Sequence, residues 1–86
     1  MKLEARVLVF EEVRKNCVGI CSVVMDDSYV VHDIRIMTGE KGLWVAMPNK
    51  FNMKKNEYED KFHPITSAAR KELFDCVLDA YKAKTL

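Results

Sequence analysis

The chain has 86 residues, of which 49% are hydrophobic and 31% are charged, and its formal net charge is +1. This balance is typical of one globular domain and excludes an intrinsically disordered chain. It also excludes a strong overall positive field, so binding to a nucleic acid would need a local basic patch, or two patches combined in a dimer.

The first quarter of the chain has the pattern of two short strands. An imperfect two-residue alternation over residues 3–13 predicts the first strand, and Lys15 and Asn16 supply a turn. Residues 17–25 are apolar and β-branched enough for a second strand, and the turn-forming residues 26–28 lead into a third. Because these connections are short, neighbouring strands are expected to be antiparallel.

The third predicted strand covers residues 29–37. Side-chain alternation predicts one face that is apolar apart from a histidine: Val30, His32, Ile34 and Ile36. A histidine in that position is more often a satisfied core residue than a catalytic base. Asp33 lies on the opposite face, which rules out a His32–Asp33 dyad unless a bulge interrupts the strand. Asp33 shares its face with Arg35, and we expect a cross-strand or inter-subunit ion pair.

A fourth strand completes the predicted sheet. Gly39 and Gly42 bound a loop of hairpin length, and the short apolar run 43–47 ends at Pro48, which cannot donate to a strand ladder. Residues 1–47 therefore form a predicted β-meander. Residues 48–64 are rich in charge and lack a clear pattern, so we expect an exposed, mobile loop there.

The only clear helical pattern covers residues 65–84. Pro64 disfavours helical geometry at His63, and Thr66 or Ser67 can cap the helix. The predicted apolar face consists of Leu73, Phe74, Cys76, Val77, Leu78, Ala80 and Tyr81. The whole chain is thus expected to be a single α+β domain, in which this C-terminal helix packs on an antiparallel sheet of about four to five strands.

Arg70 interrupts the apolar face of the predicted helix. On a helical wheel it shares an axis with Val77 and Tyr81, at the N-terminal end of the stripe. An unpaired guanidinium group cannot remain buried there. Three possibilities stay open: the side chain extends past the sheet edge, pairs with a carboxylate such as Asp33, or binds an anion at the helix N-terminus, where free amides favour negative charge.

Other chemistry has little support in the sequence. Cys17 and Cys21 on one strand would lie roughly 13 Å apart at about 3.3 Å per residue, so we expect these thiols and that of Cys76 to be reduced. We find no zinc-ligand spacing, serine elbow or phosphate loop, and therefore expect no metal, no cofactor and no enzyme activity. The apolar runs are strand-sized and no signal-like core is present, which predicts a cytoplasmic protein without membrane contact.

Three motifs occur in order along the chain: V-H-D-I-R-I at residues 31–36, G-x-x-G-L-W-V-A-M-P-N-K at residues 39–50, and F-H-P-I-T-S at residues 62–67, followed by the helix. Together they resemble the stage V sporulation protein G (SpoVG) family, small bacterial septation regulators. The resemblance covers roughly residues 26–81, and the combination of motifs is specific.

The resemblance implies a homodimer that binds DNA or RNA and regulates septum formation and, in spore formers, sporulation. The family's contacts with nucleic acid are generally assigned to basic residues near this helix, and Arg70 stands where the family has its arginine. The expected phosphate contacts are Arg70, Lys71, Lys50, Lys54 and Lys55. Trp44 and Phe51 are candidates for base stacking, although Trp44 is expected in the core or in an interface.

The near-neutral net charge favours an alternative. In that hypothesis the chain is a non-catalytic protein-interaction module of the cell-division machinery, which binds a partner protein through the 48–64 loop and an exposed sheet edge.

Overall fold

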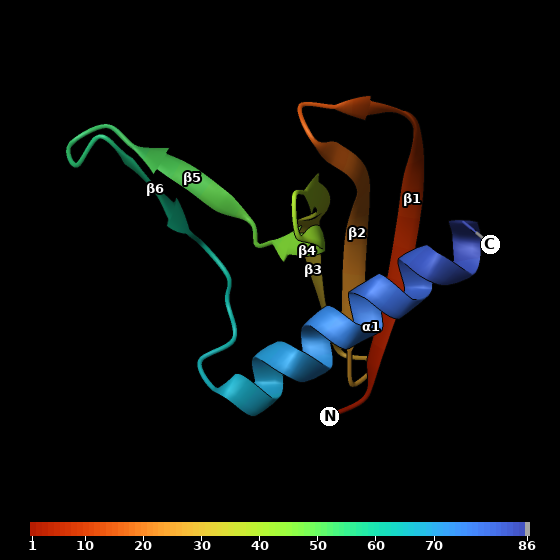
Figure 1. Cartoon of the computed structure of the whole chain (residues 1–86). Helices are drawn as coiled ribbons and strands as arrows, with labels where there is room; N and C mark the ends of the chain where they lie inside the picture. Colours follow the sequence, from red (N-terminus) through yellow and green to blue (C-terminus); the bar gives the residue numbers. More distant parts are fainter. Residues whose placement is uncertain (86) are drawn as a thin grey trace.

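The computed structural model describes residues 1–85 as two antiparallel sheets and one C-terminal helix (Figure 1). The larger sheet has the order β1-β2-β3-β4, and its strands are β1 (Leu3–Arg14), β2 (Cys17–Met25), β3 (Tyr29–Gly39) and β4 (Gly42–Ala46). Each strand pairs with the next one along the chain. The predicted α+β fold, with a four-stranded meander and a C-terminal helix, is confirmed.

The helix α1 (Ser67–Thr85) crosses one face of the larger sheet, and its closest packing is against β1. The Thr66 hydroxyl accepts a hydrogen bond from the Ala69 amide at 3.0 Å, so Thr66 is the one of the two predicted residues that caps the helix. The buried core between helix and sheet consists of Val7, Val18, Cys21, Val23, Val31, Ile34, Ile36, Val45, Met47, Leu73 and Val77. At the C-terminal end, the Lys84 ammonium donates to the Val7 carbonyl at 2.6 Å and joins α1 to the edge strand β1.

A β-bulge in β3 changes which side chains enter the core. Cys21 pairs with Ile34 and Val23 pairs with Val31, so the single residue Ser22 lies opposite both His32 and Asp33. Asp33 has a φ of 64°, a left-handed conformation that aspartate tolerates better than most residues.

The bulge overturns the predicted apolar face of the third strand. Val31, rather than Val30 or His32, joins Ile34 in the core, and His32 is exposed. Within residues 1–85, His32 still forms no ion pair with Asp33, and its Nδ1 atom lies 2.8 Å from the Ser22 hydroxyl instead.

The prediction of a loop over residues 48–64 is wrong in its central part. Two strands, β5 (Asn49–Asn52) and β6 (Glu57–Asp60), pair there as a second, two-stranded sheet. The Asn52 side-chain oxygen accepts hydrogen bonds from the Lys54 and Lys55 amides and so stabilises the turn that joins β5 to β6. This β5–β6 hairpin projects away from the larger sheet (Figure 1). In the part of the chain described here, no helix is long and apolar enough to cross a membrane.

Gly19 allows β1 and β2 to approach closely, and replacing it should destabilise the sheet. A Cβ atom at this position would lie 2.9 Å from the Leu8 carbonyl oxygen, which belongs to the backbone and cannot move aside alone. We expect Gly19→Ala to lower the free energy of unfolding by about 1–3 kcal/mol. The midpoint of thermal unfolding, followed by circular dichroism, should fall accordingly. Gly39→Ala is the matched control, since its Cβ would meet only the Trp44 side chain, at 3.5 Å.

Candidate nucleic-acid interface

The β5–β6 hairpin has one charged face and one aromatic face. Lys50 pairs across the strands with Glu59, and the neighbouring pair is Phe51 with Tyr58. Successive side chains of a strand point to opposite faces, so these two pairs lie on opposite sides of the hairpin. The Phe51 and Tyr58 rings meet edge to face, with centroids 5.1 Å apart.

The hairpin lysines differ in whether a carboxylate lies close to their ammonium groups. Lys55 lies 3.3 Å from a carboxylate oxygen of Glu59, and Lys61 lies 3.9 Å from the other oxygen. Within residues 1–85, neither Lys50 nor Lys54 has a carboxylate oxygen within 4.0 Å. These two free cations and Lys61 contribute to a shallow hollow of about 380 Å³ on the hairpin, which is also lined by Phe51, Asn52, Met53 and the carboxylate-bearing Glu59. Lys61, which is not among the predicted phosphate contacts, thus belongs to the same surface.

Arg70 is exposed, and its side chain is not buried between the helix and the sheet. The guanidinium group lies 5.6 Å from the centre of the Phe74 ring and donates a 3.4 Å hydrogen bond to the Pro64 carbonyl. No carboxylate of the described residues lies within 4.0 Å of it, so the predicted alternative of an ion pair with Asp33 does not occur. All residues of α1 before Leu73 are exposed, and Arg70 therefore extends into solvent.

Lys71 is exposed but paired. Its ammonium group lies 2.6 Å from a carboxylate oxygen of Asp75, one helical turn later. The hydrogen bond to Asp75, and then the negative charge of Asp75, raise the pKa of Lys71 above its ordinary value. A phosphate would have to compete with Asp75 for this cation, whereas it would meet Arg70 without a competitor.

The five predicted contact residues thus form two groups. Lys50, Lys54 and Lys55 lie together on the β5–β6 hairpin, and Arg70 and Lys71 lie on the exposed N-terminal part of α1. Residues 61–66 connect the hairpin to the helix. The first turn of α1 contains no acidic residue, so its free amides and dipole add to the positive charge of Arg70.

The bulge creates one pair that alternation could not predict, Ser22 with His32. Both lie on an open strand surface, and a catalytic pair would also need a group that orients the histidine and donors that stabilise an oxyanion. Among the described residues, no three side chains of His, Cys, Asp or Glu are placed to hold a metal ion. Trp44, expected in the core or in an interface, is about half exposed.

Comparison with known proteins identifies relatives across most of the chain. The SpoVG family model matches residues 1–83. A septation protein SpoVG from Agathobacter rectalis is 43% identical over 66 residues, which are 77% of this chain and 75% of that protein. The septation protein SpoVG of Archaeoglobus fulgidus is 44% identical over 61 residues, 71% of each chain.

Proposed function

This chain belongs to the SpoVG family of septation proteins, and from that membership we propose that it acts in septum formation, and in sporulation where cells sporulate, as a homodimer that binds DNA or RNA. The observation that carries the proposal is the exposed Arg70 guanidinium without a carboxylate partner in the described chain. A guanidinium group presents forked donors that match phosphate oxygens.

The hairpin supplies the second part of the proposed contact. Lys50 and Lys54 are exposed and have no carboxylate partner within residues 1–85, so each can bind a phosphate without losing an ion pair. Lys55 and Lys71 can contribute after giving up Glu59 and Asp75. A dimer would present every contact twice, which compensates for the low net charge of one chain.

The salt dependence of binding to duplex DNA tests this proposal. Removing Arg70 and Lys54 together, as R70A/K54A, deletes four contacts from a dimer. The slope of log affinity against log salt concentration should become shallower by about 3 to 4, because each phosphate contact contributes about 0.9. Fluorescence anisotropy with labelled DNA and with labelled RNA, each over a range of salt concentrations, gives this slope directly.

The matched control removes two cations from elsewhere. Lys41 and Lys82 are exposed and have no carboxylate within 4.0 Å in the described chain, so K41A/K82A changes the net charge equally. It should retain nearly the wild-type slope. Equal slopes in the two double variants would show that general charge, rather than this surface, attracts the polyanion. No binding by the wild type at physiological salt would overturn the nucleic-acid proposal.

That last outcome would support the second candidate, a non-catalytic protein-interaction module of the division machinery. The observation that favours it is the apolar surface of the chain: the side chains of Ile65 and Met53 are 88% and 87% exposed. Such side chains serve a protein partner better than a phosphate backbone.

A further inference from the structure

One chain exposes more surface than its mass accounts for. Its accessible area is 6494 Å², whereas a compact monomer of 10.0 kDa exposes about 5,200 Å². The radius of gyration is 13.2 Å, compared with about 12 Å for a compact domain of this length. A stable interface takes about 800 Å² from each partner, which is less than the excess.

The β5–β6 hairpin accounts for part of this excess. Its backbone contacts are almost entirely internal, and no residue from 49 to 60 is buried. An isolated two-stranded hairpin is marginally stable in water, so it needs a surface to pack on. Its aromatic face and its tip offer three apolar side chains for such packing, those of Phe51, Tyr58 (70% exposed) and Met53.

The face of the larger sheet opposite α1 is also uncovered. Leu8, Ile20, Arg35 and Ala46 are neighbours across the four strands on this outer face, because the residues preceding or following them point into the core. The side chain of Leu8 is 62% exposed.

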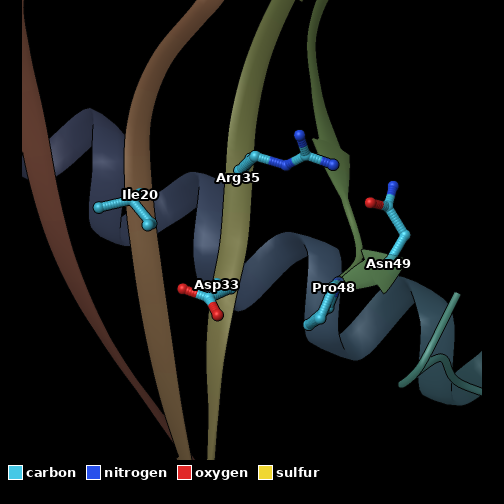
Figure 2. Close-up of a pocket in the computed structure, with 5 residues that line it drawn as sticks. All are labelled: Ile20, Asp33, Arg35, Pro48 and Asn49. Carbon is cyan, nitrogen blue, oxygen red and sulfur yellow. The ribbon is translucent and has the colours of Figure 1, made fainter. Parts of the chain in front are cut away.

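A shallow pocket of about 300 Å³ opens on the same outer face (Figure 2). It is lined by Ile20, Asp33, Arg35, Pro48 and Asn49. Figure 2 shows these side chains from the side of the strands opposite α1, next to the point where β5 begins. Neither Asp33 nor Arg35 has an ion-pair partner within residues 1–85, so the predicted ion pair is not made within one chain.

We propose that the aromatic face of the β5–β6 hairpin of one chain packs on the outer sheet face of a second copy, and that the exchange is reciprocal. The second copy is the occupant because the chain carries both halves of the contact, an unsupported hairpin with an aromatic face and an uncovered sheet face that carries Leu8 and Ile20. In a two-fold dimer, each hairpin packs on a surface and each outer sheet face is covered.

This arrangement has two consequences for charged groups. Asp60, which alternates onto the aromatic face of the hairpin, comes close to the unpaired Arg35 of the other copy and gives that guanidinium a partner. The charged face of the hairpin, with Lys50, points away from the interface and stays available for phosphate. The inference rests on the homodimer of the proposed function and does not depend on nucleic-acid binding.

Sedimentation without nucleic acid tests the exchange through two kinds of variant. The arm variant Y58S, or M53D at the hairpin tip, and the face variant L8K should each weaken dimerisation at least about 30-fold, as loss of a central contact does. All three positions are well exposed in the single chain, so circular dichroism should show unchanged folding. Ile65→Lys is the matched control, since Ile65 is 88% exposed and lies outside both surfaces, and it should dimerise like the wild type.

Mixing the two defective variants gives the decisive measurement. An M53D chain keeps an intact sheet face and an L8K chain keeps an intact hairpin, so a 1:1 mixture should form a heterodimer with one good contact, although each variant alone is monomeric. A mixture that stays monomeric overturns the exchange, and so does a monomeric wild type or an M53D variant that dimerises normally. A dimer lost in L8K but retained in both arm variants would instead indicate direct packing of two sheet faces.

Discussion

Replacing Val77 by aspartate is expected to unfold the chain at 25 °C. Val77 lies at the centre of the helix face that packs on the sheet, and its side chain is 0% exposed. Burying an unpaired carboxylate there costs several kcal/mol. A domain of 86 residues has a total free energy of unfolding of only about 4–13 kcal/mol. Urea unfolding followed by circular dichroism should therefore show a loss of at least about 4 kcal/mol, or no cooperative transition.

Two control variants separate the buried charge from other effects. Ala83→Asp adds the same charge to the same helix at an exposed position, and should cost only about 1 kcal/mol, through lower helix propensity and an unfavourable position in the last turn. Val77→Ala removes the packing without adding charge, and should cost about 2 kcal/mol. If Val77→Asp were as stable as Ala83→Asp, α1 would not be packed on the sheet in solution.

The four-stranded meander could be predicted because residue types that favour turns occur where its strands end. Lys15 and Asn16 have φ angles of 52° and 68°, and Asp26 and Asp27 have φ angles of 51° and 53°. Asparagine and aspartate are the non-glycine residues that accept this left-handed conformation most readily, and it gives the tight turns that join antiparallel strands. Local sequence therefore decides where the strands end.

The bulge could not be predicted, because strand alternation assumes one residue opposite one residue. The sequence of β3 is compatible with a regular strand, and the choice between regular and bulged depends on which of Val30 and Val31 enters the core. The bulge lets Val31 and Ile34 enter the core together, at the cost of one left-handed residue, Asp33.

The helical wheel correctly placed Arg70 on the side of α1 that faces the sheet. It could not show that the sheet ends before it reaches Arg70. Arg70 lies in line with Val77, yet burial on α1 begins only at Leu73, because the first turns of the helix extend past the core. Likewise, the hairpin strands lack an apolar alternation because neither of their faces is buried within one chain. Both features depend on where tertiary contacts stop, which a periodic pattern does not contain.

Stability should fall above pH 9 because of Cys21. Its side chain is 2% exposed, and burial is the main cause that raises its pKa from 9.0 to about 11. The folded chain therefore keeps this proton in a range where the unfolded chain loses it. The stabilisation is fully present below pH 9, falls by about 1.4 kcal/mol per pH unit above it, and has largely gone by pH 11.

Urea unfolding of the wild type and of Cys21→Ala at pH 7.5, 9 and 10.5 isolates this effect. The other titrating groups remain in both proteins, and their contributions cancel in the difference apart from the minor electrostatic coupling between Cys21 and Cys76, whose pKa is also raised by burial. Cys21→Ala should be less stable than the wild type at pH 7.5 because it leaves a small cavity. At pH 10.5 the difference in the free energy of unfolding between the two proteins should be smaller by about 2 kcal/mol. Parallel loss of stability in the two proteins would mean that the Cys21 thiol ionises as readily in the folded chain as in the unfolded one, which its burial between β1, β3 and α1 should prevent.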